Sequence, residues 1–466
     1  MDTTGRVACL GLLAILLPGC VAGPNYQKPV VAAPPEYRGA SSAQAGSSVT
    51  SFGDEKWWDA FQDDALRELI RSALQQNNDV KIAAARILEA RAVLGIVRAD
   101  QLPQVNASAS IANERFNEAL GRPAVQTSVT QVGVSSVWEL DFWGKFRRAT
   151  ESARANLLSS EWAQRQVVSS LVSDVADEYF QLREMDLELE ISRRALTSRR
   201  DSLRLTQTLA DGGATSLLDV RQAEQLVFSA AATISDLERR IEQEENSISI
   251  LLGNNPGRVV RGRPLLDQPH PLEVPAGLPS SLLERRPDIL EVEQRLVAAN
   301  AQIGVAKADY FPQIVLTAAG GAQSFALAQL FSTPAGFWSV GVGTLQPVFD
   351  GGRIRSRVGV AEARTEEARF LYQRTVQQAF REVSDALVGY RKNQEVRSQQ
   401  QLLTGAAEDA IRLASMRYQG GASSYLEVLD SETRFLSAQL TLAQAELHEI
   451  ESVVQIYRSL GGGWEQ

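Results

Sequence analysis

Apolar residues recur every three or four positions over a stretch from Lys145 to Leu209 that contains neither proline nor glycine. The recurring positions include Val168, Leu171, Val172, Val175, Tyr179 and Leu182. This spacing predicts a single helix. At 1.5 Å per residue such a helix would be about 97 Å long, which is more than one face of a compact domain can cover. A second stretch of the same kind, also without proline, runs from Arg353 to Gln419.

Glycine pairs follow both long stretches, and a further helical pattern follows each pair. Gly212 and Gly213 end the first stretch, and Gly420 and Gly421 end the second. Glycine readily adopts the left-handed conformation that ends helices. The sequence therefore predicts two helical hairpins, over about 145–253 and about 353–461.

In the segments before these hairpins the apolar period drops to two. Val105, Ala107, Ala109 and Ile111 alternate with polar residues, and Trp338, Val340 and Val342 alternate with Ser339, Gly341 and Gly343. Such alternation predicts strands, at about 104–141 and about 313–349. Small polar residues on one face, apolar residues on the other and aromatic ends are typical of membrane β-barrels.

The chain is internally duplicated. The stretch from Asn78 aligns with the stretch from Pro287, 209 positions later, and FWGKFR from Phe142 aligns with DGGRIR from Asp350. The sequence thus predicts one structural repeat over 61–270 and a second over 271–466. We expect DGGR to form a strand-to-helix turn, and the C-terminal GGGWEQ to be a frayed tail.

Strand number limits how the protein assembles. Two hairpins give four strands per chain, whereas a closed membrane barrel needs about eight or more. Subunits must therefore share one barrel. Two subunits would give eight strands and a filled interior, and three would give twelve strands and room for a channel. The pattern alone leaves both possibilities open.

The N-terminal residues are typical of a secretion signal. The apolar run from Val7 to Leu17 is too short to span a bilayer, and LPGC places Cys20 after a small residue, as in a bacterial lipobox. We expect 1–19 to be a signal peptide and Cys20 to carry covalent lipid, such as palmitate. An extended lipid-anchored segment over 20–60 would follow.

Composition argues against several classes of protein. The net charge of −9 and the pI of about 5.2 disfavour nucleic-acid binding. His270 and His448 are the only histidines, and Cys20 would be the one cysteine left after cleavage. A metal site, a histidine-based triad or a redox centre is therefore not expected, and we predict no catalytic residues, no cofactor and no enzymatic activity.

Six motifs in order resemble the lipoprotein branch of the TolC-like outer membrane efflux factors. They are GPNYQKP from Gly23, WWDAFQDDAL from Trp57, WELDFWGK from Trp138, RRPDILEVEQRLVAANAQIGVAKADYFPQI from Arg285, QPVFDGGR from Gln346 and YLEVLD from Tyr425. Together they cover nearly the whole mature chain. The resemblance implies an α+β chain that forms a homotrimer with a twelve-stranded membrane β-barrel and a long periplasmic α-helical barrel.

The resemblance also implies a function. The trimer would lie in the bacterial outer membrane, in contact with its lipid, and extend into the periplasm. It would be a passive exit duct for small molecules and drugs. Its partners would be a periplasmic adaptor, or membrane fusion protein, and an inner membrane pump of the RND type.

Several site residues follow from matching these positions. Glu427 and Asp430 match the acidic residues that narrow the periplasmic end of the helical barrel, and their spacing places them on one helix face. Tyr418 matches a tyrosine that links neighbouring coils, although Ser423 replaces the basic residue that assists it in some members. The expected adaptor-docking tip comprises Gly212, Gly213, Ala214, Gly420, Gly421 and Ala422.

Two other functions remain open at this stage. A type I protein-secretion system uses an exit duct of the same architecture. A periplasmic coiled-coil scaffold lipoprotein without a pore would explain Cys20 and the long helices, but it would leave the alternating strands and the duplication unexplained.

Overall fold

The computed structural model describes residues 21–35, 37–38, 51–54, 56, 62–117, 125–269, 275 and 279–464. Cys20 and His270 lie outside these residues. The chain divides into two compact units. The first comprises 1–30, 86–161 and 291–373, and the second comprises 31–85, 162–290 and 374–466. Each unit thus takes segments from both sequence repeats.

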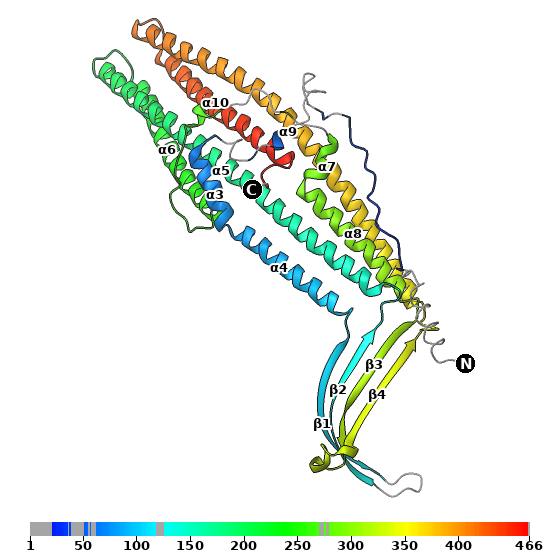
Figure 1. Cartoon of the computed structure of the whole chain (residues 1–466). Coiled ribbons are helices and arrows are strands. Elements are labelled where there is room, and N and C mark those ends of the chain that lie inside the picture. The colour runs from blue at the N-terminus through cyan, green and yellow to red at the C-terminus, as the bar shows by residue number, and fades with distance from the viewer. Residues whose placement is uncertain are drawn as a thin grey trace. The chain divides into compact units, whose positions relative to one another are not determined.

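Long helices and four strands make up most of the chain (Figure 1). In order, the elements are α3 Asp64–Gln76, α4 Asn78–Ala99, β1 Gln104–Phe116, β2 Val125–Glu139, α5 Lys145–Asp211, α6 Leu217–Leu251, α7 Leu282–Arg285, α8 Pro287–Ala308, β3 Gln313–Ser324, β4 Gly336–Leu345, α9 Arg353–Gln419 and α10 Tyr425–Ser459. The predicted α+β class, with four strands per chain, is confirmed.

The four strands form one antiparallel sheet in the order β1-β2-β3-β4. Its register places Ala107 opposite Val134, Val134 opposite Gly320, and Gly320 opposite Trp338. Directly paired residues share a face, so the apolar stripes of the separate strands form one apolar face. Ser339 lies on the opposite face, in a row with Ala319 and Ser135.

The apolar stripe of α5 is buried, as its period predicts. Val172, Val175, Tyr179 and Leu182 are completely inaccessible to solvent. Because the stripe follows a helical period, burial of these side chains fixes which face of α5 points into the core of the second unit. The predicted helix is therefore confirmed, and the residues expected on its apolar face are the buried ones.

A buried carboxylate organises the start of α3 in the second unit. Asp63 caps the helix by accepting hydrogen bonds from the backbone N–H groups of Ala65 and Leu66. Its other oxygen accepts hydrogen bonds from the Tyr179 hydroxyl at 3.0 Å and from Gln268 Nε2 at 2.9 Å. Segments far apart in sequence therefore meet at one side chain.

The C-terminal segment is docked, so the expectation of a frayed tail is wrong for its described part. Leu460 to Gly463 are buried, and the Ser169 hydroxyl donates to the carbonyl of Gly462 at 2.6 Å. The Trp464 ring meets that of Trp162 edge to face, with centroids 6.0 Å apart. Gly462 lies so close to the Tyr457 ring that a Cβ atom would stand 2.6 Å from it. Glycine is required there because the backbone packs directly on an aromatic ring.

The segment that follows Cys20 is fixed in the first unit. Arg148, 4% exposed, donates to the carbonyl of Ala22 at 3.2 Å and to the side chain of Asn25 at 2.7 Å. Gly23 adopts a φ of 87° and lies against Gly304, where a Cβ atom would come within 2.5 Å of its neighbour. The chain is therefore held in place from the residues directly after Cys20.

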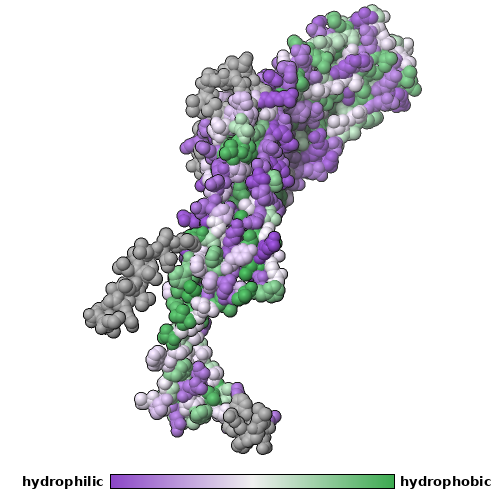
Figure 2. Space-filling view, turned by 90° about the vertical axis from the view of Figure 1, so that its right-hand side faces the viewer, coloured by the Kyte–Doolittle hydropathy of each residue, from purple (hydrophilic) through white to green (hydrophobic). Residues whose placement is uncertain are grey.

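The isolated chain leaves apolar surface uncovered. Figure 2 shows hydrophobic patches between hydrophilic ones on the face in view. On the apolar face of the sheet, Trp338 is 81% exposed and Val340 is 74% exposed. Within the described ranges, no helix combines the length and the apolar character needed to cross a membrane.

Candidate functional site

The second unit contains two helical hairpins. In each of them one turn connects the two helices, and the two turns have the same geometry. The N–H of Ala214 donates to the carbonyl of Leu209 at 2.8 Å, and the N–H of Ala422 donates to the carbonyl of Arg417 at 2.8 Å. Such bonds close a helix end when the preceding residue is left-handed. Gly213 and Gly421 fill that role, with φ values of 72° and 69°.

Only the second glycine of each pair has a positive φ. Gly212 and Gly420 instead donate their N–H groups back to the preceding helical turn, at 3.2 and 3.0 Å. The tip residues expected from the sequence are therefore brought together as two compact turns, one in each hairpin.

The two hairpins differ in how the next helix begins. In α6, Ser216 and Asp219 form a reciprocal capping box, so this carboxylate is bound to the backbone. Its hydrogen bond from the Thr215 hydroxyl holds the pKa of Asp219 below its usual range. In α10, Ser424 makes no side-chain cap bond, and Glu427, which corresponds to Asp219, is left out of the cap. The carboxylate of Glu427 is thus available for other contacts.

Each of the predicted acidic residues faces an arginine of the same chain. Glu427 Oε1 lies 3.4 Å from Arg417 Nε on α9. Asp430 Oδ2 lies 2.7 Å from Arg434 Nε on α10. All four side chains are at least 45% exposed, so these pairs contribute little to stability. The pairs matter for the local electrostatic potential, because a positively charged arginine lies beside each carboxylate.

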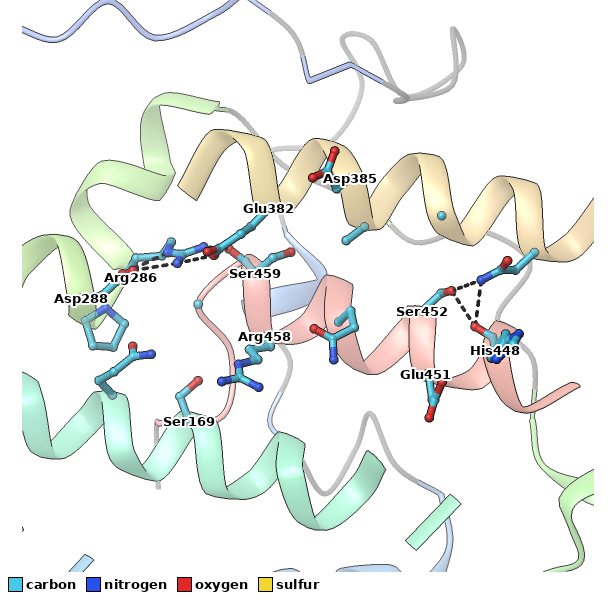
Figure 3. Close-up of a pocket in the computed structure, with 17 residues that line it drawn as sticks. Ser169, Arg286, Asp288, Glu382, Asp385, His448, Glu451, Ser452, Arg458 and Ser459 are labelled. Atoms are coloured by element: carbon cyan, nitrogen blue, oxygen red, sulfur yellow. Dashed lines mark hydrogen bonds and ion pairs between the residues drawn. The ribbon is translucent and has the colours of Figure 1, made fainter. Parts of the chain in front are cut away.

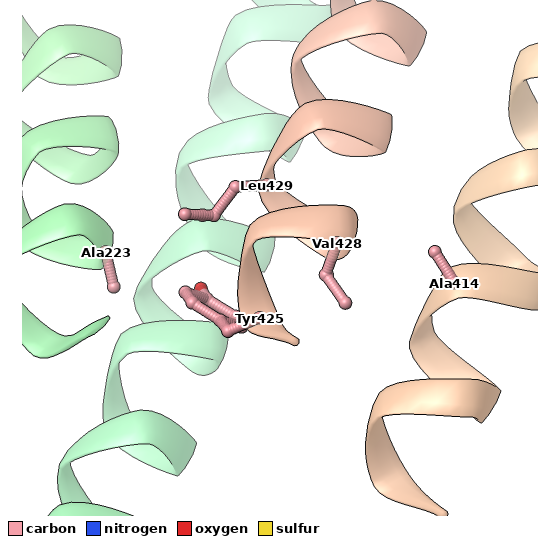
Figure 4. Packing of buried hydrophobic residues seen from close by; sticks show 5 residues of the cluster. All are labelled: Ala223, Ala414, Tyr425, Val428 and Leu429. Atoms are coloured by element: carbon pink, nitrogen blue, oxygen red, sulfur yellow. The ribbon is translucent and has the colours of Figure 1, made fainter. Parts of the chain in front are cut away.

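A small apolar cluster fixes which face of α10 is buried near the start of this helix. Tyr425, Val428 and Leu429 are buried, and they pack with Ala223 of α6 and Ala414 of α9. Figure 4 shows Val428 on the side of α10 toward Ala414, and Tyr425 and Leu429 on the side toward Ala223. Because these residues occupy the buried face, Glu427 and Asp430 remain on the exposed face.

Tyr418 contacts this cluster through its ring. The Tyr418 and Tyr425 rings lie 5.3 Å apart, at an interplanar angle of 49°. Among the described residues, neither the buried Tyr418 hydroxyl nor the buried Ser423 hydroxyl has a hydrogen-bond partner. Within one subunit, Tyr418 therefore joins α9 to α10 by packing and not by a hydrogen bond.

A buried pair of opposite charges lies nearby, and sequence analysis missed it. Arg199 of α5 is 6% exposed and donates to the carbonyl of Leu226, while Ser202 donates to the carboxylate of Glu432 at 3.2 Å. Burial lowers the pKa of Arg199 and raises that of Glu432, and attraction between the two opposes both shifts. Only the fold brings α5 and α10 together, so no local pattern could have revealed this electrostatic interaction.

A polar cavity of about 710 Å³ lies between α5, α9 and α10 in the same unit (Figure 3). Arg286 at one end donates to Asp288 and Glu382, both at 2.7 Å, and to the carbonyl of Ser459 at 3.0 Å. Asn393 donates to Ser452 at 2.7 Å. These lining groups are paired with one another across the helices, so we assign the cavity to helix packing.

No group of three or more histidine, cysteine, aspartate or glutamate residues in the described part of the chain is arranged to hold a metal ion. The ends of the hairpins combine exposed charged pairs, two tight turns and a small packed apolar cluster. These features suit contact with solutes and partner helices.

A model of the family described as "Outer membrane efflux protein" matches residues 69–254 and again 278–462. The two matches cover most of the chain and follow its internal duplication. The chain therefore belongs to the outer membrane efflux protein family.

Relatives and solved structures agree with this assignment. The solvent efflux pump outer membrane protein SrpC of Pseudomonas putida is 36% identical over 462 residues, covering 97% of each chain. The cation efflux system protein CusC of Escherichia coli is 32% identical over 457 residues, covering 97% of this chain and 98% of CusC. The structure of the outer-membrane channel OprN shares 34% identity and a TM-score of 0.88, and the match covers 96% of this chain and 100% of that one.

The protein is an outer membrane efflux channel that extends into the periplasm. It works as a homotrimer with a periplasmic adaptor and an inner membrane pump, so three subunits share the barrel. Its family consists of transport proteins and needs no cofactor. The comparisons favour the efflux channel over both the protein-secretion duct and the scaffold without a pore.

Proposed function

We propose that the ends of the helical hairpins form the gate of this channel, with Glu427 and Asp430 at its narrowest point. In a trimer, the exposed face of α10 would present three copies of each carboxylate around the threefold axis. Arg417 and Arg434 would accompany them, so the gate would be a ring of alternating charges. Passage would be controlled mainly by width, and the carboxylates nearest the axis would add a preference for cations.

One observation carries this proposal. Asp219 in the first repeat is used to cap α6, whereas the corresponding Glu427 in the second repeat is free of the cap and turned toward Arg417. The duplication would otherwise make the two positions alike. A carboxylate released from backbone capping in one copy only supports a separate role for that copy.

The turns at the ends of the hairpins are the proposed adaptor-docking site. Gly212, Gly213 and Ala214 form one turn, and Gly420, Gly421 and Ala422 form the other. They expose backbone and small side chains only. Helices of a partner could therefore approach closely at these ends. Tyr418 would hold the second hairpin in place by its contact with Tyr425.

At the other end of the chain, we propose that 1–19 is removed as a signal peptide and that Cys20 carries the lipid anchor. The docking of Ala22 and Asn25 on Arg148 supports this proposal, since it would hold the lipidated residue next to the first unit. Mass spectrometry of the mature N-terminus tests it. An unmodified terminus beyond Cys20 would refute it.

The inner membrane partner is proposed to be a pump of the RND type that exports small molecules. Relatives are named for solvent and for cation efflux, so their names do not fix the cargo of this channel. The gate residues described above contain no cysteine and no methionine. Charge and width, not soft-metal ligation, would therefore decide what passes.

Cysteine cross-linking tests the gate. In trimers reconstituted into lipid, Asp430→Cys should form covalent oligomers on oxidation, because three copies would meet near the axis. Gln222→Cys, at the corresponding position of the first repeat, is the matched control and should cross-link far less. Equal cross-linking of both variants, or none for Asp430→Cys, would place the constriction elsewhere.

A further inference from the structure

Two buried carboxylates lie one turn apart on α5, within the second unit. Glu184 is 5% exposed and Glu188 is 7% exposed. Glutamate is almost never buried so deeply unless it is paired, and like charges four residues apart on a helix repel each other. The negative charge of this pair must therefore be compensated inside the fold.

The two carboxylates are buried by helices of their own subunit. Arg240 on α6 lies 3.7 Å from Glu188. One turn before Glu184, the Gln181 amide donates to Glu451 on α10 at 3.0 Å. Both carboxylates are buried in the isolated chain, so they leave almost no surface for a neighbouring subunit to contact. Their charge must therefore be compensated by groups of the same chain.

The positive charge at this site is too small to balance the pair. Among the described residues, Arg240 is the one ion-pair partner of Glu188, and Glu184 has no ion-pair partner. The Arg240 side chain is 42% exposed, so water screens part of its charge. Glu451 adds a further negative charge on the α10 side. One partly screened cation therefore faces two buried carboxylates.

The other charged groups near the pair do not supply the missing charge. Arg240 also attracts Glu244, one turn further along α6, and Glu244 in turn faces the carboxylate of Glu178 on α5. The remaining charged groups pair with one another, and they are Asp186 with Arg183 and Arg261. The charge of Arg240 is therefore divided among several carboxylates.

The hydrogen-bonding geometry of the pair also requires a proton. Glu184 lies within hydrogen-bonding reach of Glu188. An ionised carboxylate only accepts hydrogen bonds, so two carboxylates can bond to each other only when one of them carries a proton. Among the described residues, no group donates to the buried Oε1 of Glu184. A proton on Glu184 removes one buried charge and makes this side chain a donor to Glu188.

We propose that Glu184 and Glu188 share one proton at neutral pH, and that this hydrogen bond is a pH-sensitive link that keeps α5 packed against α6 and α10. Glu184 carries the proton, and Glu188 accepts the hydrogen bond and faces Arg240. When the pH rises, the proton leaves to water. Two carboxylates then repel each other in a buried site, so the packing of α5 weakens.

The direction of the pH effect follows from the folded state. Burial, and then the carboxylate of Glu188, raise the pKa of Glu184 above its ordinary value. The stabilisation by the link is therefore complete below the ordinary pKa of about 4, declines as the pH rises and is absent above the raised folded value.

The link joins the two helical hairpins of one subunit. Glu184 and Glu188 belong to α5 in the first hairpin, and Glu451 belongs to α10 in the second. Loss of the proton therefore eases movement of one hairpin against the other. The link lies along the helices and away from the hairpin ends, so it does not depend on the proposed gate.

Infrared spectroscopy of the reconstituted trimer tests the shared proton. As the pH rises from about 6 to 9, the wild type should lose a carboxyl C=O band that Glu184→Gln lacks. Glu188→Gln should shift this loss to lower pH by about one unit or more, because the amide donates to Glu184 and the second charge is gone. Glu190→Gln, at an exposed position on α5, is the control and should titrate like the wild type. If Glu188→Gln also titrates like the wild type, Glu184 is a lone buried acid and the shared proton is refuted.

Hydrogen exchange followed by mass spectrometry tests the link between the helices. After correction for the intrinsic exchange rate, local opening of α5 around Glu184 should increase with pH between about pH 5 and pH 8. The increase should be steeper in the wild type than in Glu184→Gln, by a factor of up to about ten for each pH unit, because opening releases the proton. Glu190→Gln should follow the wild type. The link is overturned if Glu184→Gln keeps the pH dependence of the wild type.

Discussion

Arg434 Nε lies 2.7 Å from Asp430 Oδ2, one helical turn along the exposed face of α10. Each acidic residue of the proposed gate therefore has a cationic side chain directly beside it. Arg417 has the same relation to Glu427 across the hairpin, at 3.4 Å. The face that sequence matching describes as acidic is thus nearly neutral in one subunit. Selectivity of the gate should depend on which charges lie nearest the axis.

Removing the arginines should make the channel more cation-selective. Replacing Arg417 and Arg434 with glutamine leaves Glu427 and Asp430 without counter-ions, so the local potential becomes more negative. Reversal potentials across a salt gradient measure the effect, and the shift should shrink as ionic strength rises. Arg412→Gln, which removes the partner of Asp409 on α9, is the control and should leave selectivity unchanged. Identical reversal potentials in all three proteins would contradict the charge arrangement.

Asp63 should be important for the stability of the second unit. Replacing it with alanine leaves the hydroxyl of Tyr179 and the N–H of Arg263 without an acceptor in a buried site, and it leaves the amide of Gln268 with the carbonyl of Arg263 alone. A cost of about 2 to 4 kcal/mol is expected. Chemical unfolding in detergent measures it. Asp64→Ala, at the neighbouring and 96% exposed position, should change the free energy of unfolding by well under 1 kcal/mol.

Acidification should also weaken this site. Burial alone would raise the pKa of Asp63, but the donors of Gln268, Arg263 and Tyr179 hold it below its usual range. The stabilisation is therefore present above the ordinary pKa of about 4 and is lost as the pH falls through the lower folded value. Wild type should lose stability below about pH 4 more steeply than Asp63→Asn, since asparagine does not titrate.

Alkaline conditions should loosen α5 from its neighbours. Burial, and then the carboxylates of Glu451 and Asp174, raise the pKa of Asp177 to about 7. Burial, and then the carboxylate of Glu188, raise the pKa of Glu184 to about 8. Both folded values exceed the ordinary value of about 4, so this contribution is complete below pH 4, is lost progressively as the pH rises, and is gone once the pH exceeds about 7 to 8.

Thermal unfolding between about pH 4 and pH 9 measures this loss. Glu184→Gln should flatten the dependence and should be at least as stable as wild type at pH 9, because it carries no charge into the buried site. Glu190→Gln, at an exposed position on the same helix, should keep the wild-type dependence. The account of Glu184 fails if the two variants behave alike.

The sheet register predicts unequal tolerance to charge. Val340 lies on the apolar face with Ala318, and Ser339 lies on the opposite face with Ala319. An arginine at Val340 near the middle of the membrane should cost about 2 to 4 kcal/mol, whereas an arginine at Ser339 should cost much less. Heat-resistance of the trimer in detergent compares the two. Equal effects would refute the assignment of the faces.

The fold could be predicted in some detail because apolar residues recur with a clear helical or strand period along its elements. The apolar positions from Val168 to Leu182 fix a helix, and the alternation from Trp338 to Val342 fixes a strand face. The C-terminal segment was misjudged because Gly461 to Gly463 have no side chains to form a pattern. They are buried because Tyr457 and Ser169 pack on bare backbone.

The candidate site was less predictable. Asp430 and Arg434 form an i, i+4 pair that the sequence shows, but the predicted site included only the acidic residue of the pair. Arg417 meets Glu427 only across the turn. Arg199 and Glu432 lie on helices of different repeats. Such contacts depend on tertiary packing, which no local pattern encodes.

The gate can be tested most directly by single-channel conductance of the trimer in planar bilayers. Glu427→Ala with Asp430→Ala should raise conductance, weaken cation preference and remove block by multivalent cations added from the periplasmic side. The matched variant Asp219→Asn with Gln222→Ala, at the corresponding positions of the first repeat, should conduct like wild type. If the Glu427 and Asp430 variant keeps the conductance, selectivity and block of wild type, the two residues are solvated helix charges and the constriction is not at the start of α10.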